Sequence, residues 1–241
     1  MRIVAIIPAR AGSKRLPRKN ALEIEPGISL VQQAVDCAEA SGVIDETFVL
    51  TDDPALRFRH ATYLGEPPEL AGDHADISAA VAEAAERIER STGRIDYVVT
   101  LQPAVLARSA LIIQRIVHAV LREGAGGAVT AARTVPWQWS VRDGAAANAW
   151  HPGPYPRSQH APHHLAEINA VQVAGRAAVA DRQRWGMPLL LAELPPWVAS
   201  LDIDEPADLA FARDLWPWAR IRLETWEPTM HRVETINGAA A

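Results

Sequence analysis

The segment that decides the fold is RIVAIIP, residues 2–8, which continues directly into ARAGSKRLPRKN, residues 9–20. The first part is an apolar, β-branched run, typical of a buried strand. The second part places five cations and a Gly-Ser pair immediately after that strand. Backbone N–H groups and cations in such a loop can hold a triphosphate, and in an open α/β sheet ligands bind outside the carboxyl ends of the strands. A solvated basic loop is the alternative that composition leaves open.

Strand and helix patterns alternate along the rest of the chain. Apolar residues recur at helical spacing after Ser29, and Gly42 ends that helix before a second strand at residues 47–50. Further strands are predicted at residues 96–101, 128–131, 168–173 and 189–192. Further helices are predicted at residues 76–89, 109–122 and 177–184, and a last one begins near Pro206. The alternation predicts an α/β fold with a doubly wound, mostly parallel, Rossmann-like sheet.

One main domain is expected over residues 1–225, with two irregular parts. Residues 134–167 are rich in Trp, Pro, Gly and His, and we interpret this insertion as a lid or a dimerisation element. The tail, residues 226–241, shows no periodicity, and we expect it to be frayed or only loosely docked.

Composition narrows the class of protein. A chain of 241 residues that is 49% hydrophobic can build a sizeable core, and a net charge of −5 argues against wrapping of nucleic acid. The only cysteine, Cys37, lies in an Ala-rich apolar stretch and is interpreted as a small buried side chain rather than a nucleophile. The apolar run at residues 3–7 is too short for a signal sequence or a membrane span. We therefore expect a soluble cytoplasmic protein with no membrane partner.

The basic loop matches neither the Walker A pattern nor G-x-G-x-x-G. Its pattern I-P-A-R-x-G-S-K, followed after four residues by K-N, fills residues 7–20 and resembles the opening loop of the acylneuraminate and 3-deoxy-manno-octulosonate cytidylyltransferases. Further matches follow in the order of that family up to about residue 216: Thr51-Asp52-Asp53, Leu101-Gln102-Pro103 with Arg108, Arg157 and Gln159, Asn169, and Asp202-Ile203-Asp204.

The resemblance implies an enzyme that transfers CMP from CTP to a small acidic acceptor and releases pyrophosphate. It implies that Arg10 and Lys19 act on the phosphates as the catalytic cations. The nucleotide site that it implies consists of Ala9, Arg10, Gly12, Ser13, Lys19 and Asn20. The acceptor site that it implies consists of Gln102, Arg108, Arg157, Gln159 and Asn169.

Two carboxylates near the end of the domain are predicted to hold a metal. By the resemblance, Asp202 and Asp204 bind Mg²⁺, or Mn²⁺ in its place. Residues at i and i+2 of an extended segment point to the same side and can share a hard cation, which agrees. The alternative is that Asp204 only caps the following helix, because Asp before Glu-Pro is a strong capping signal.

Aromatic and imidazole side chains crowd the insertion. His151, His160, His163 and His164 match no common zinc framework, so no zinc site is expected. The tryptophans there, Trp137, Trp139 and Trp150, favour a subunit interface, and we expect a homodimer.

The sequence also departs from the family that it resembles. Glu66 stands where the family's R-P-x-E-L segment has an arginine that reads cytosine. Ala104, Val105 and Val173 replace residues with hydroxyl groups, which predicts an apolar acceptor wall and favours a small phosphonate as acceptor. Two alternatives stay open: a synthetase for CMP-sialic, other CMP-nonulosonic or CMP-3-deoxy-manno-octulosonic acid, and a non-catalytic nucleotide-binding scaffold.

Overall fold

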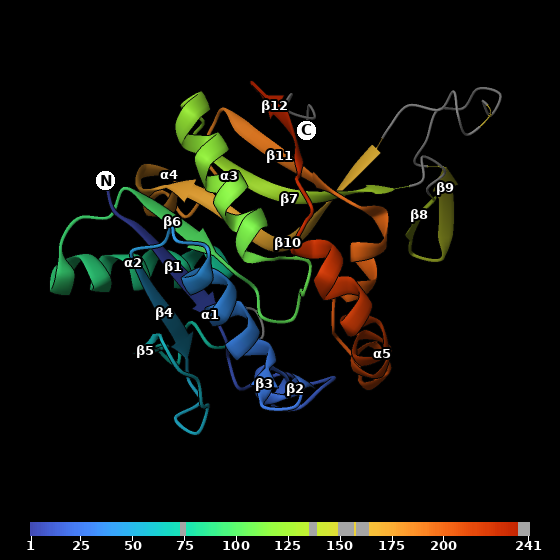
Figure 1. Ribbon diagram of the computed structural model, residues 1–241, viewed down its shortest axis with the longest axis horizontal. Helices are drawn as coiled ribbons and strands as arrows, with labels where there is room; N and C mark the ends of the chain where they lie inside the picture. The colour runs from blue at the N-terminus through green and yellow to red at the C-terminus, as the bar shows by residue number, and fades with distance from the viewer. Residues whose placement is uncertain (73–75, 135–138, 149–156, 158–163, 236–241) are drawn as a thin grey trace.

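A computed structural model describes residues 1–72, 76–134, 139–148, 157 and 164–235, and an eight-stranded sheet organises them (Figure 1). The strand order is β12-β11-β7-β10-β6-β1-β4-β5, in which β10 and β12 run antiparallel to their neighbours and the other pairs are parallel. The strands are β1 (Ile3–Pro8), β4 (Glu46–Thr51), β5 (Thr62–Gly65), β6 (Tyr97–Thr100), β7 (Gly127–Thr134), β10 (His164–Gly175), β11 (Leu189–Leu194) and β12 (Thr229–Val233).

Helices cover both faces of this sheet. They are α1 (Leu30–Ala40), α2 (Ile77–Thr92), α3 (Ala110–Glu123), α4 (Arg176–Ala180) and α5 (Pro206–Leu223). One apolar core joins the sheet to α1, α3 and α5, and a second joins it to α2 and α4. Ile3, Ala5 and Ile7 of β1 belong to the first core, whereas Val4 and Ile6 belong to the second, because alternate side chains of a strand point to opposite faces. The predicted doubly wound α/β fold is confirmed.

The helices begin where the sequence predicted. Ser29, Asp76 and Ser109 each accept a hydrogen bond from a backbone N–H of the first turn of α1, α2 and α3. The helix predicted at residues 177–184 is wrong in its second half, since α4 ends at Ala180. Downstream, the backbone of Gly186 lies against that of Gly126, so closely that a Cβ on Gly186 would be 2.6 Å from the Gly126 oxygen. Because α4 ends at Ala180, the segment that follows it is free to place Gly186 against Gly126.

Several strands were not predicted. They are β5, the hairpin of β2 (Glu23–Glu25) and β3 (Ile28–Ser29), the hairpin of β8 (Trp139–Arg142) and β9 (Ala145–Asn148), and β12. The expectation of a loosely docked tail is wrong for β12, which pairs with β11 over its full length, from Leu189–Val233 to Glu193–Thr229. The unpaired N–H and C=O groups of an edge strand provide this docking site, and the composition of the tail does not reveal it.

The insertion at residues 134–167 is described in part. The β7–β10 pair extends to Thr134 and His164, and Figure 1 shows the β8–β9 hairpin beyond that end of the sheet. Trp137, Trp150 and the histidines at positions 151, 160 and 163 lie outside the described residues. A lid or dimerisation role for this insertion stays a prediction.

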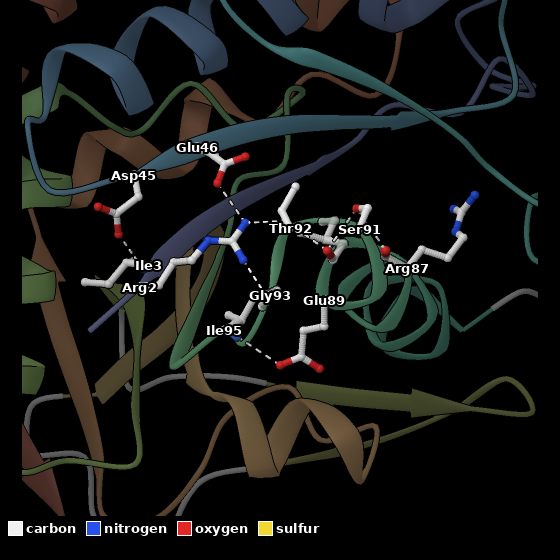
Figure 2. Close-up of polar contacts among 11 residues, drawn as sticks. Arg2, Ile3, Asp45, Glu46, Arg87, Glu89, Ser91, Thr92, Gly93 and Ile95 are labelled. Carbon is white, nitrogen blue, oxygen red and sulfur yellow. Dashed lines mark hydrogen bonds and ion pairs between the residues drawn. The ribbon is translucent and has the colours of Figure 1, made fainter.

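Polar contacts around Arg2 join β1 and β4 at their amino ends, opposite the carboxyl ends from which the basic loop leaves (Figure 2). Its guanidinium donates to Glu46 at 2.7 Å and to Thr92 at 2.6 Å, which ties the start of β1 to the start of β4 and the end of α2. The N–H of Ile3 donates to Asp45 at 2.7 Å. These contacts join β1, β4 and α2 at the amino ends of the two strands.

No helix among the described residues is long and apolar enough to cross a membrane.

Candidate active site

The basic loop after β1 is held by contacts to the end of β4. The N–H of Ala9 donates to Leu50 at 2.8 Å, and the buried Thr51 hydroxyl donates to the Ala9 carbonyl at 2.7 Å. The N–H of Ala11 donates to Asp52 at 2.6 Å, and the amide of Asn20 returns to the Arg10 carbonyl at 3.0 Å. The loop is therefore an ordered feature of the fold, which decides against a merely solvated basic segment.

Two cavities open on this loop, and they share the side chains of Arg10, Lys19 and Asn20. The inner cavity, about 250 Å³, has apolar walls formed by Pro8, Leu70, Ile77, Ala80, Pro103 and Ala104. Glu66 and Gln102 also line the inner cavity. The outer cavity, about 360 Å³, is lined by the shared residues and by Ser13, Lys14, Arg15 and Asp204. The two cavities thus meet at Arg10 and Lys19; the inner one has the apolar side chains, and the outer one carries the further cations Lys14 and Arg15.

Asp204 faces the cations of the loop. One carboxylate oxygen accepts from the Lys19 ammonium at 3.0 Å and the other from Arg15 at 2.6 Å. The hydrogen bond from Lys19 is the main cause that lowers the pKa of Asp204, so this carboxylate stays ionised. The capping alternative for Asp204 is wrong, because Asp208 accepts from the N–H groups of Asp204 and Glu205 at the start of α5.

The segment that follows β6 positions Asp202 close enough to Asp204 for the two charges to interact. Val105 and Asp202 form a β-bridge, the N–H of Leu106 donates to Leu201 at 2.9 Å, and the N–H of Ile203 donates to Ala104 at 3.0 Å. Loss of water around its carboxylate, followed by the like charge of Asp204, raises the pKa of Asp202. A bound cation would relieve that repulsion.

Within the described residues, no group of three or more His, Cys, Asp or Glu side chains gathers in a way that could hold a metal. A metal at this site would have two carboxylates and the oxygens of a bound phosphate as its ligands. Mg²⁺ is commonly bound through one or two carboxylates plus substrate phosphates, so the donor set of Asp202 and Asp204 fits it.

Arg108 does not face the inner cavity, which corrects the acceptor role expected for it. It is only 1% exposed, and its guanidinium donates to the carbonyls of Gln102, Pro103 and Val105. Burial lowers the pKa of Arg108 to about 10. Arg108 therefore supports from beneath the segment that forms one wall of the cavity and positions Asp202.

Other predicted acceptor residues are scattered. Gln102 lines the inner cavity, whereas Asn169 accepts from Gln172 at 2.9 Å at an irregularity of β10 and lines neither cavity. Arg157 is exposed, and Gln159 lies outside the described residues. Of the members of this set that the structure describes, Gln102 alone lines one of the two cavities.

The apolar acceptor wall inferred from the sequence is mostly core. Val105 and Val173 are buried in the first apolar core, and Ala104 alone of the three positions lines the inner cavity. The loss of hydroxyl groups at positions 105 and 173 therefore reflects core packing, and it carries no information about the acceptor.

Glu66 enters the inner cavity from the end of β5. Its N–H donates to the Thr51 carbonyl at 2.9 Å, and its side chain is half-buried, with one carboxyl oxygen that is fully buried and has no hydrogen-bond partner. Desolvation and the neighbouring Asp52 raise the pKa of Glu66 to about 7, against the opposing charges of Arg10 and Arg87.

Some cavity residues were missed by the sequence reasoning. Arg15 was counted among the cations but given no role, although it contacts Asp204. Leu70, Ile77 and Ala80 come from the segment before α2 and from its first turn, and they reach the cavity only through the packing of that helix on the sheet. The sequence signal that could have pointed to Ile77 and Ala80 was the Asp76 cap, because it marks where α2 begins.

Residues 4–136, more than half of the chain, match the family described as Cytidylyltransferase, and the chain belongs to that family. Pseudaminic acid cytidylyltransferase from Campylobacter jejuni subsp. jejuni is 34% identical over 106 residues, 42% of this chain and 45% of that protein. CMP-N,N'-diacetyllegionaminic acid synthase from Legionella pneumophila subsp. pneumophila is 34% identical over 123 residues, 49% of this chain and 53% of that protein. The matched stretches span about half the length of these relatives.

Solved structures show the same fold at low identity. A CMP:2-keto-3-deoxy-manno-octonic acid synthetase complexed with CTP superposes with a TM-score of 0.67 at 18% identity, over 90% of this chain and 99% of that one. A 4-diphosphocytidyl-2C-methyl-D-erythritol synthase from Anaerococcus prevotii gives a TM-score of 0.58 at 12% identity, over 90% of this chain and 96% of that one.

Replacement of Arg108 tests its structural role. Arg108→Ala removes the guanidinium donor from the buried carbonyls of Pro103 and Val105 and opens a cavity, so we expect the free energy of unfolding to fall by about 3 kcal/mol or more in urea denaturation. The matched control is Arg115→Ala, which breaks an exposed ion pair with Glu227 and should cost under about 1 kcal/mol. Equal stability of the two variants would contradict the supporting role of Arg108.

Proposed function

We propose that this protein transfers CMP from CTP to an acidic sugar and releases pyrophosphate. The observation that carries the proposal is the junction of the two cavities. An inner cavity of about 250 Å³ with apolar side chains on part of its wall meets an outer, cationic cavity at Arg10 and Lys19; Asp204 lines the outer cavity, and the exposed Asp202 lies near enough to act on its charge. A nucleoside triphosphate has this division into an apolar-faced base and a polyanion.

In this proposal the residues of the chain bind and orient the triphosphate. Arg10 and Lys19 lie at the junction, where they would hold the α-phosphate region and neutralise charge that develops as pyrophosphate leaves. Ser13, Lys14 and Arg15 would hold the outer phosphates. An acceptor oxygen would attack the α-phosphorus in line, and positioning with electrostatic stabilisation would supply most of the rate.

Asp202 and Asp204 are the proposed holders of Mg²⁺ or Mn²⁺. When bound, such a cation supplies Lewis-acid stabilisation of phosphate charge. Asp204 already bridges to Lys19, so the carboxylate pair and the phosphate-binding cation form one connected unit. The raised pKa of Asp202 means that its carboxylate is more readily protonated than an ordinary aspartate until a cation binds.

The acceptor is proposed to be an acidic sugar, because the names of the relatives are those of enzymes for pseudaminic, diacetyllegionaminic and 3-deoxy-manno-octulosonic acids. The second candidate is a small phosphonate. The residues without hydroxyl groups favoured it at the level of the sequence, but the wall at Pro103 and Ala104 belongs to the cavity assigned to the nucleoside and does not distinguish the two acceptors.

An acceptor panel tests the proposal. We expect pyrophosphate release from CTP and Mg²⁺ with at least one 2-keto-3-deoxy sugar acid, and a lower kcat/KM with small phosphonates. Turnover of phosphonates alone would establish the second candidate. CTP binding without pyrophosphate release from any acceptor would contradict the enzymatic proposal and favour a nucleotide-binding scaffold.

Lys19 and Arg18 form a matched pair for a second test. Lys19→Ala removes a cation from the junction, and we expect kcat/KM to fall by an amount equivalent to about 2–4 kcal/mol. Arg18→Ala should change it far less, because Arg18 is exposed, pairs with Asp53 at 3.5 Å and lines neither cavity. Steady-state kinetics in which Arg18 is the more sensitive position would show that the phosphate site is wrongly placed.

Asp202→Asn tests the metal site. The change keeps the shape of the side chain but removes a hard anionic ligand, so turnover should be lost at all Mg²⁺ concentrations while the unfolding midpoint stays near that of the wild type. Direct Mn²⁺ binding, followed by electron paramagnetic resonance, should weaken in parallel. Near-wild-type turnover at low Mg²⁺ would exclude Asp202 as a ligand.

A further inference from the structure

The inner cavity contains one acidic side chain among its described lining residues, and that side chain is incompletely satisfied. Glu66 has a fully buried carboxyl oxygen without a hydrogen-bond partner, and it lines this cavity together with apolar side chains such as Leu70 and Ile77. An unpaired buried polar atom is costly and calls for an explanation, and at the wall of a cavity a bound ligand can supply the missing partner. Arg10 and Lys19, the cations proposed to hold the phosphates, line the same cavity and are shared with the outer one.

We propose that Glu66 is the residue that reads the nucleobase, and that it does so as a neutral carboxylic acid paired with the N3 and N4 edge of cytosine. The proposal rests on the proposed function, since it takes CTP as the ligand. Cytosine presents an acceptor at N3 and a donor at its exocyclic amino group. A carboxylic acid presents the complement, with its O–H donating to N3 and its carbonyl oxygen accepting from the N4 amino group.

The ionised form of Glu66 would not make this pair. A carboxylate offers acceptors only, so its second oxygen would face the N3 lone pair of cytosine and repel it. When CTP binds to the ionised protein, one proton must therefore be taken up from solvent, and it is shared between the Glu66 oxygen and N3. An ionised Glu66 would instead suit guanine, because N1 and the exocyclic N2 of guanine are both donors.

The surroundings favour the neutral form of Glu66. The charged groups that act on it come from three elements packed around the cavity: Asp52 after β4, Arg10 after β1 and Arg87 on α2. Burial and Asp52 outweigh the two arginines and raise the pKa of Glu66 to about 7. Below that pH the acid is present and ready to pair, and above it each CTP bound must first restore the proton. CTP affinity should therefore fall as the pH rises through 7.

Calorimetric titration of CTP at pH 6 and pH 8, at constant Mg²⁺, tests the inference. Inorganic tripolyphosphate is the second probe, because it occupies the phosphate end without a base and reports titration of the phosphates themselves. After division by the change seen with tripolyphosphate, the Kd of the wild type for CTP should be about tenfold larger at pH 8 than at pH 6, given a pKa of about 7. Tripolyphosphate affinity should not depend on residue 66.

Two variants separate base reading from a structural role. Glu66→Gln replaces the acid by an amide, which offers the same donor and acceptor to N3 and N4 without a titrating proton. We expect it to bind CTP with a corrected Kd ratio near one and, at pH 8, at least as tightly as the wild type. Glu66→Ala should bind CTP at least tenfold more weakly than Glu66→Gln at both pH values, because it lacks both hydrogen-bonding groups.

Three outcomes would overturn the inference. They are CTP binding by the wild type without this pH dependence, equal CTP affinity of Glu66→Gln and Glu66→Ala, and GTP binding that exceeds CTP binding and strengthens as the pH rises. The failure of the proposed function looks different: tripolyphosphate binds, but none of the three proteins binds CTP more tightly than tripolyphosphate at either pH.

Discussion

The ion pair between Lys19 and Asp204 joins two parts of the chain that lie 185 positions apart, and the site depends on it. Four cations of the basic loop, Arg10, Lys14, Arg15 and Lys19, line one small cavity and repel one another. Asp204 offsets part of that repulsion, because it accepts from Lys19 and Arg15 with different oxygens. The same contact holds the basic loop beside Asp204.

Buried hydrogen bonds of Arg108, as well as apolar packing, hold the cavity wall and Asp202 in place. Arg108 is held in the interior by three carbonyls of the segment from Gln102 to Val105, and the same segment bonds to the backbone on either side of Asp202. A guanidinium without a carboxylate partner is expensive to bury, and it persists here because it satisfies several carbonyls at once. Arg108 thus supports both the cavity wall and the segment that carries Asp202, although it lines neither cavity.

Environment gives the carboxylates of the site different roles. Asp204 is ionised because Lys19 and Arg15 contact it, whereas Glu66, across the shared cations, is shielded from water and retains its proton more strongly. Separation of pKa values among neighbouring carboxylates is how a site assigns charge-holding and hydrogen-bond-donating tasks. In this protein Asp204, in the outer cavity, has a lowered pKa, whereas Glu66, in the inner cavity, and Asp202, beside Asp204, have raised pKa values.

The sequence by itself determined the α/β fold, most helix starts and the position of the basic loop after β1. Each depends on a local signal: apolar periodicity for the fold, Ser and Asp caps for the helix starts, and cations next to Gly after a strand for the loop. Only the tertiary structure decided which of the candidate residues meet. In the folded chain Arg108, Val105 and Val173 are buried, and Asp204 does not cap α5. β12 pairs with β11, and Glu66 lines the inner cavity. The physical reason is that burial and the choice of hydrogen-bond partner are set by contacts between segments distant in the chain, and no local pattern encodes them.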